Sequence, residues 1–264
     1  MKHNNTKAKI RAGGVALGCF VRYANAALVE LLGYQGWDFL VFDAEHGTIE
    51  PQDCEQMVRA AELRGVTPIA RAPTNAAHVI LRYLDTGLQG VHIPLVNTRA
   101  DMEAAVASVK YHPSGVRGLA GTRAASYGQA MPLKEYTKRA NEETLIVAHI
   151  ETAEAVERLD TILGVKGLDV VFIGPTDLSH SFGVPGDTEH PRVREAVERI
   201  VTMTLESDIA LGIFVGNAGA GAEWCRRGAR YVAIGLESVL GPAARTYLSD
   251  VREVAAHDPT VQAS

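Results

Sequence analysis

The stretch FLVFDAEHG, which runs from Phe39 to Gly47, decides both the fold class and the place of the chemistry. Its first four residues are all apolar, as expected of a parallel strand that is covered on both faces. The strand then ends in Asp43, Glu45 and His46, three ionisable groups within four residues. We therefore expect a buried parallel strand whose carboxyl end opens into a polar site.

Apolar runs of the same kind recur along the chain, and helix-like segments separate them. One such segment has Pro51 near its start and Gly65 just beyond its end, the asymmetry expected of a helix. Eight strand–helix units in succession favour an α/β fold, a (β/α)8 TIM barrel, over a doubly wound open sheet. The expected strands are 15–20, 38–43, 67–71, 90–95, 145–151, 169–174, 210–215 and 231–236.

The alternation sets the domain boundaries. We expect one barrel domain over residues 13–256, with flexible termini at 1–12 and 257–264. Residues 111–143 interrupt the rhythm, because they are rich in glycine, polar and basic residues and are long for a strand–helix connection. A loop of that length in a compact domain is usually functional or flexible.

Composition excludes several classes of protein. The net charge of −5 and the scattered basic residues argue against a nucleic-acid surface. No apolar run approaches the roughly 20 residues that span a bilayer, and the polar opening MKHNNTKAKIR is not a secretory signal. The three cysteines are far apart and form no CxxC pair. We expect a cytoplasmic protein that binds neither membrane nor nucleic acid.

Charged residues stand at the carboxyl ends of four expected strands, and these ends meet at one mouth of a TIM barrel. Besides Asp43 and its neighbours, the sequence places Arg71, Glu151 and Asp177 there. Glu151 and Asp177 follow consecutive strands, and two carboxylates with water are typical of a Mg2+ or Mn2+ site. Read separately, Glu151 could cap a helix and Asp177 could hold a turn.

The neighbouring groups leave further alternatives open. Asp43 could hold the ring of His46 as the partner of a general base, or bond the backbone N–H groups of a turn. Arg71, at a buried strand end, should face an anion, either a substrate carboxylate or an acid across the barrel. His92 lies within an apolar strand and indicates a satisfied core histidine. Asp85 ends a helix, where the dipole disfavours an acid, which hints at a specific role.

Four motifs together resemble the HpcH/HpaI aldolase family, the metal-dependent (class II) pyruvate aldolases of the 4-hydroxy-2-oxo-heptane-1,7-dioate aldolase and 2-keto-3-deoxy sugar-acid aldolase type. The resemblance covers roughly residues 13–250. It implies a (β/α)8 barrel whose last helix is exchanged between subunits of a hexamer, a trimer of dimers. The motifs are DAEHG (43–47), IARAP (69–73), HIETAEAVERLD (149–160) and FIGPTDLSHSFG (172–183).

The resemblance also implies roles for individual residues. It makes Glu151 and Asp177 the ligands of a divalent metal, Mg2+, Mn2+ or Co2+, and His46 the catalytic base. His149 stands where many members have Gln, and it could be a third metal ligand, a donor to a ligand, or a replacement for the amide. The remaining implied roles are Asp43 as the partner of His46, Arg71 on the keto and enolate oxygen, Gly174, Pro175 and Thr176 around the pyruvate carboxylate, and Asp85 reaching the site of a neighbouring subunit.

The activity that the resemblance implies is reversible cleavage of a 4-hydroxy-2-oxo acid to pyruvate and an aldehyde through a metal-stabilised enolate. The alternatives are oxaloacetate decarboxylation, a citrate-lyase-like reaction, or a non-catalytic barrel that binds a keto acid. A Schiff-base aldolase is disfavoured, because none of the lysines ends an expected strand. The sequence does not name the aldehyde.

Overall fold

Eight parallel strands hydrogen-bond in sequence order and close into a barrel in the computed structural model, which describes residues 1–257. The predicted (β/α)8 barrel is confirmed, and each observed strand begins and ends within two residues of its expected bounds. The strands are β1 (Ala16–Val21), β2 (Phe39–Asp43), β3 (Thr67–Arg71), β4 (Gly90–Ile93), β5 (Leu145–Ile150), β6 (Val170–Ile173), β7 (Ala210–Val215) and β8 (Tyr231–Gly235).

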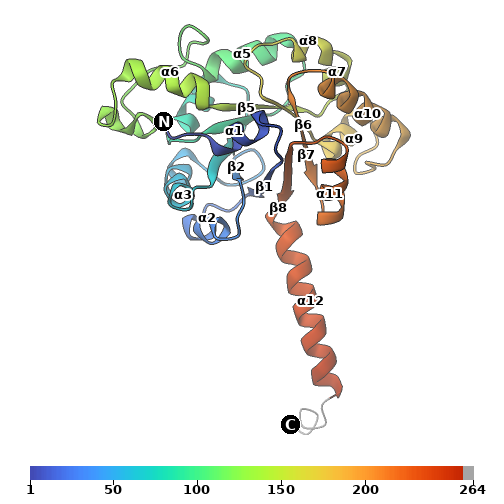
Figure 1. Ribbon diagram of the computed structural model, residues 1–264. Coiled ribbons are helices and arrows are strands. Elements are labelled where there is room, and N and C mark those ends of the chain that lie inside the picture. The colour runs from blue at the N-terminus through green and yellow to red at the C-terminus, as the bar shows by residue number, and fades with distance from the viewer. Residues whose placement is uncertain (258–264) are drawn as a thin grey trace.

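Helices surround the sheet (Figure 1). A capping box between Glu50 and Asp53 and a left-handed Gly65 fix the two ends of α3, as its sequence predicts. The helices that follow strands are α2 (Ala26–Gly33), α3 (Pro51–Arg64), α4 (Ala77–Leu84), α5 (Arg99–Val109), α7 (Ala153–Glu157), α8 (Leu159–Leu163), α9 (Pro175–Ser181), α10 (Pro191–Leu205), α11 (Ala218–Arg226) and α12 (Leu236–His257).

Apolar residues fill the barrel interior near the amino ends of the strands, and polar residues lie nearer the carboxyl ends. Phe39 and Val41 belong to the interior cluster, so the alternation of side chains places Asp43 on the same inward face of β2. Asp43 pairs in register with Arg71, and Arg71 pairs with His92 on the next strand. The register thus sets three polar residues side by side at one level of the barrel.

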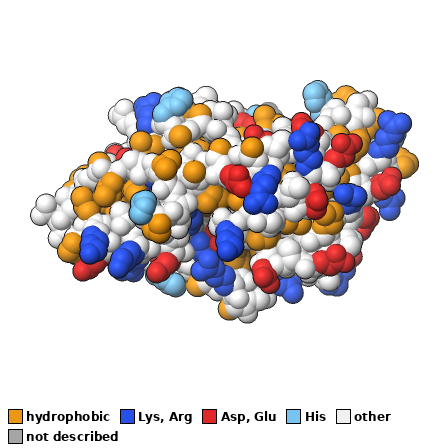
Figure 2. Space-filling view, turned by 90° about the horizontal axis from the view of Figure 1, so that it is seen from above, with side chains coloured by type: hydrophobic (Ala, Val, Ile, Leu, Met, Phe, Trp, Pro, Cys, Tyr) orange, Lys and Arg blue, Asp and Glu red, His pale blue; other side chains and the backbone are white. Residues whose placement is uncertain are grey.

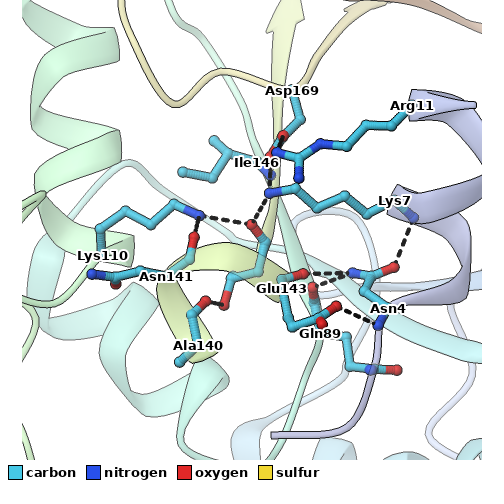
Figure 3. A network of polar contacts seen from close by, with 11 residues as sticks. Asn4, Lys7, Arg11, Gln89, Lys110, Ala140, Asn141, Glu143, Ile146 and Asp169 are labelled. Carbon is cyan, nitrogen blue, oxygen red and sulfur yellow. Dashed lines mark hydrogen bonds and ion pairs between the residues drawn. The ribbon is translucent and has the colours of Figure 1, made fainter. Parts of the chain in front are cut away.

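The prediction of a flexible segment at 1–12 is wrong. Residues Asn5–Arg11 form a helix, α1, and Asn4, Thr6 and Lys7 are all buried. Their side chains bond groups at the amino ends of four strands: Asn4 donates to Gln89 O, Thr6 to Asp38 O and to the Thr67 hydroxyl, and Lys7 to Asp169. Helix α1 therefore closes the amino end of the barrel (Figure 3). The other predicted flexible end, 257–264, lies almost wholly outside the described residues.

The segment 111–143 is not one long loop. It contains a 3-10 helix, η1 (Arg123–Gly128), and a regular helix, α6 (Leu133–Glu143). Asn141 holds the segment's beginning to its end, because its side chain bonds both the N–H and the C=O of Tyr111. Tyr136 is 1% exposed and packs edge-on against the Tyr111 ring. The polar composition concealed this small apolar core.

The last helix, α12, projects away from the barrel (Figure 1). In the single chain it leaves apolar side chains in solvent, among them Leu240, Tyr247, Val251 and Val254. No helix within residues 1–257 combines the length and hydrophobicity of a membrane span. On the face seen in Figure 2, acidic and basic side chains are interspersed.

The buried position of Asn4 generates a first prediction. Its side chain accepts from Lys7 N and donates to Gln89 O and Glu143 O, so Asn4→Ala removes one hydrogen bond from each of these three backbone groups. Gln89 O keeps the bond that it accepts from Leu145 N–H. We expect the free energy of unfolding to fall by about 1–3 kcal/mol, measured by urea denaturation. Lys2→Ala, which removes an exposed side chain of the same segment, is the control and should change little. Equal stability of the two variants would contradict the closing role of α1.

Candidate active site

A cavity of about 220 Å³ opens at the carboxyl ends of the strands. It collects charged side chains from β2 and β3 and the first turn of α9, and aromatic rings from β1, β6 and β7 cover its walls. The sequence predicted that these groups would meet, and the structure brings most of them together. The lining residues are Phe20, Arg22, Asp43, His46, Arg71, His149, Phe172, Gly174, Pro175, Thr176, Asp177 and Phe214.

A bidentate ion pair joins β2 to β3 in this cavity. Arg71 donates from Nε to Asp43 Oδ1 at 2.8 Å and from Nη2 to Oδ2 at 2.6 Å. Burial opposes the charge on Asp43, but the hydrogen bonds and charge of Arg71 outweigh it and lower the pKa of Asp43. Glu45 reaches Arg71 Nη1 at 3.0 Å, although burial still raises the pKa of Glu45. The anion that Arg71 faces is therefore an acid of the barrel itself.

Asp43 does not hold the ring of His46, and that expectation is corrected. Both Asp43 oxygens bond Arg71, and Oδ1 also accepts the backbone N–H groups of Glu45 and His46 at 3.3 and 3.2 Å. This is the turn arrangement that the sequence left open. The His46 imidazole is exposed and makes no side-chain hydrogen bond with any other residue of the described chain. It is therefore free to meet a ligand in the cavity.

Glu151 and Asp177 converge on one point beside Gly174. A Cβ added to Gly174 would lie 3.2 Å from Glu151 Oε2 and 3.5 Å from Asp177 Oδ2. Glu151 is buried, and Asp177 is exposed in the first turn of α9. Burial opposes ionisation of Glu151, but the neighbouring His149, the Leu95 N–H and Arg71 outweigh it, so the pKa of Glu151 is lowered. Two carboxylate oxygens thus lie beside the same backbone position.

These donors suit a small divalent cation. Carboxylate oxygens are the ligands that Mg2+ and Mn2+ prefer, and both ions keep several positions for water or substrate. Within residues 1–257, no three His, Cys, Asp or Glu side chains form a metal-holding group. Glu151 and Asp177 are the two carboxylates that could hold such a cation.

Residues Gly174, Pro175 and Thr176 form the start of α9 and line the same cavity. Gly174 is the N-cap and Pro175 the first helical residue. The backbone N–H groups of a first helical turn lack partners within the helix. This stretch therefore presents polar backbone beside the two carboxylates.

Asp85 lies apart from the cavity. It ends α4 and pairs with Arg117 at 2.8 Å. It lines a separate depression together with Arg82, Thr122 and Tyr127. Within one chain, then, the structure does not bring Asp85 to the other predicted site residues.

The sequence reasoning missed Arg22 and the aromatic walls. Arg22 directly follows β1 and lies 3.7 Å from Asp43 and 3.9 Å from Glu237. The available signal was its place after an apolar run, but the expected strand ended two residues earlier, at Phe20. Phe172 and Phe214 were counted as ordinary strand residues.

Comparison with known proteins gives one consistent result. The sequence model described as HpcH/HpaI aldolase/citrate lyase matches residues 16–241. The chain is 40% identical over 195 residues to a hydroxypyruvate/pyruvate aldolase of Sagittula stellata, covering 74% of this chain and 76% of that protein. It is 32% identical over 237 residues to a 4-hydroxy-2-oxo-heptane-1,7-dioate aldolase of Escherichia coli, covering 90% of each.

The fold agrees with that result. The crystal structure of an HpcH/HpaI aldolase/citrate lyase family protein from Burkholderia cenocepacia superposes with a TM-score of 0.89 at 29% identity. The match covers 94% of this chain and 99% of that one.

The buried ion pair generates a second prediction. Arg71→Met removes both charge-assisted hydrogen bonds of the buried Asp43 and leaves Arg22, 3.7 Å away, as a weaker partner. We therefore expect the free energy of unfolding to fall by about 3–5 kcal/mol in urea denaturation at neutral pH. Adding Asp43→Asn should recover part of that loss, because it removes the stranded charge. Arg59→Met, which removes an exposed arginine from a surface pair, is the control. Strictly additive losses in the double variant would show that the two side chains do not act as a pair.

Proposed function

Because this chain belongs to the HpcH/HpaI aldolase/citrate lyase family, we propose that it is a pyruvate aldolase that depends on a divalent metal ion. The proposed reaction is the reversible cleavage of a 4-hydroxy-2-oxo acid to pyruvate and an aldehyde. The observation that carries it is the convergence of Glu151 and Asp177 beside Gly174, which lines the cavity together with Arg71 and His46.

Each group of the site has a separate role in the proposed reaction. A divalent ion bound by Glu151 and Asp177 would act as a Lewis acid on the 2-oxo acid. Arg71 keeps N–H donors beyond those bound to Asp43 and Glu45, and these donors stabilise the negative oxygen of the enolate. The backbone at Thr176 offers N–H groups to the pyruvate carboxylate.

His46 is proposed as the general base. Its imidazole accepts the proton of the C4 hydroxyl, and the C3–C4 bond then breaks. The electron pair of that bond passes into the enolate while the aldehyde forms. A proton returned to C3 gives pyruvate. The role of Asp43 differs from the one implied by the resemblance, because Asp43 orients Arg71 and the backbone of the turn. It acts on His46 through the main chain.

Two features outside the cavity support an assembly of subunits. Leu240, Tyr247, Val251 and Val254 of α12 are exposed in the single chain, and Asp85 lies away from the cavity of its own chain. We include in the proposal a homohexamer, a trimer of dimers, in which α12 is exchanged and Asp85 reaches the cavity of a neighbour. A cytoplasmic location is likewise proposed, and Cys19, Cys54 and Cys225 are all free thiols.

Metal removal generates a third prediction. The purified protein should release pyruvate from a panel of 4-hydroxy-2-oxo acids, and treatment with EDTA should abolish the release until Mg2+, Mn2+ or Co2+ is returned. The measurement is coupled detection of pyruvate, with the reverse aldol addition followed separately. Full activity after complete metal removal would overturn the metal dependence. Pyruvate from oxaloacetate alone would favour a decarboxylase, and no turnover with ligand-induced stabilisation would favour a binding protein.

The unpaired imidazole generates a fourth prediction. His46→Gln removes the base, so kcat should fall by about 10²–10⁴-fold. The melting temperature should stay unchanged, because the His46 ring bonds no other described residue. His78→Gln, at an exposed position of α4, is the matched control and should retain full activity. Activity retained in His46→Gln would assign the base to another group.

A further inference from the structure

Four buried polar side chains form one hydrogen-bonded chain across the barrel interior. Tyr231 Oη lies 2.8 Å from His92 Nε2, and His92 Nδ1 lies 2.9 Å from His149 Nε2. His149 Nδ1 in turn lies 3.1 Å from Glu151 Oε2. The chain thus runs from β8 through β4 and β5 to one of the two carboxylates beside Gly174, and all its members are at most 4% exposed.

The two ends of this chain fix the direction of every bond. The carboxylate of Glu151 can only accept, so His149 Nδ1 donates to it. The Tyr231 hydroxyl has no other side-chain partner among residues 1–257, so its buried proton is satisfied only by donation to His92 Nε2. His92 therefore carries its proton on Nδ1 and donates to His149 Nε2. Each buried N–H or O–H then has one acceptor.

The protonation of the inner members agrees with this direction. Burial holds the pKa of His92 well below its ordinary value. Burial also raises the pKa of Tyr231 well above its ordinary value. Both groups are therefore neutral, as the one-way chain requires. Phe172 packs against the His92 and His149 rings at centroid distances of 5.1 and 5.0 Å and holds them in place.

A second group holds the other oxygen of Glu151. The backbone N–H of Leu95 donates to Glu151 Oε1 at 2.8 Å. Leu95 has a φ of 53°, a left-handed conformation that is strained for a residue with a side chain. Its side chain is 56% exposed, so packing of that side chain does not explain the conformation. The conformation aims the N–H at the carboxylate.

We infer that Tyr231, His92 and His149 form a positioning chain for Glu151 and, with the Leu95 N–H, fix the rotation of its carboxylate toward the cation site. The inference rests on the proposed function for the cation itself. It settles the three alternatives for His149 in favour of a donor to a ligand, because both ring nitrogens are already bonded. Asp177 has no such support among the described residues and stays exposed. Glu151 is accordingly the rigid ligand and Asp177 the adaptable one.

Metal affinity tests the chain independently of turnover. Mn2+ binding to the full-length, metal-free protein would be measured by isothermal titration calorimetry. His149→Leu removes the donor to Glu151, and we expect the affinity to fall about 10–100-fold, the usual cost of losing such a partner. His149→Gln restores a donor and should recover part of the loss. Tyr231→Phe keeps the ring that stacks on Phe39 and removes only the hydroxyl, so it should weaken binding by a smaller factor.

Controls separate the positioning chain from general damage and from the proposed function. Tyr34→Phe removes a hydroxyl from an exposed tyrosine and should leave Mn2+ affinity unchanged. Nitrogen-15 NMR of the imidazoles gives a second readout, in which His149 should carry its proton on Nδ1. Unchanged affinity in Tyr231→Phe and His149→Leu, or a proton on His149 Nε2, would overturn the inference alone. Mn2+ binding that Glu151→Gln does not weaken would overturn the proposed metal site, and the inference with it.

Discussion

The bidentate pair between Asp43 and Arg71 is the contact around which the mouth of the barrel is arranged. Parallel register sets the two residues opposite each other at the ends of β2 and β3, where burial makes either charge costly without the other. The pair turns the guanidinium edge toward the cavity. It also gives the turn after β2 an acceptor for two backbone N–H groups, and this fixes the backbone from which His46 reaches the cavity. One ion pair therefore places both the cationic and the basic group of the site.

The barrel interior combines two kinds of packing. TIM barrels are commonly filled by layers of branched apolar side chains, and the interior near the amino ends of the strands follows that rule here with residues such as Phe39, Val41 and Ile69. Nearer the carboxyl ends, imidazole, phenol and guanidinium groups replace the apolar layer. Burying them is tolerable only because their polar atoms are bonded. A layer of hydrogen-bonded side chains has far fewer acceptable arrangements than a layer of apolar side chains. The buried polar groups therefore also orient the carboxylate of Glu151 at the carboxyl end of the barrel.

The sequence predicts the barrel well because parallel strands buried on both faces are continuous apolar runs, and all eight were recognised. It also predicts which charged residues stand at strand ends. It could not predict which partner Asp43 takes, because that depends on side-chain geometry across two strands. Helix α1 was missed because it docks through polar side chains such as Asn4 and Lys7 and lacks an apolar period. Arg22 was missed because the expected strand ended at Phe20, one residue before its observed end at Val21.

The contacts of helix α1 with residues far downstream determine when this helix can dock during synthesis. Asn4 bonds Glu143, 139 residues downstream, and Lys7 bonds Asp169, 162 residues downstream. The contacts with Glu143 and Asp169 can therefore form only after the chain has been synthesised past those residues, whereas the contacts of Thr6 with Asp38 and Thr67 can form earlier. At a typical rate of about 5–20 residues per second, synthesis of the intervening chain takes on the order of ten seconds or more. The docking of α1 is therefore complete only when β4–β6 are in place, so a nascent chain that stalls before β6 lacks part of the contacts that hold this helix.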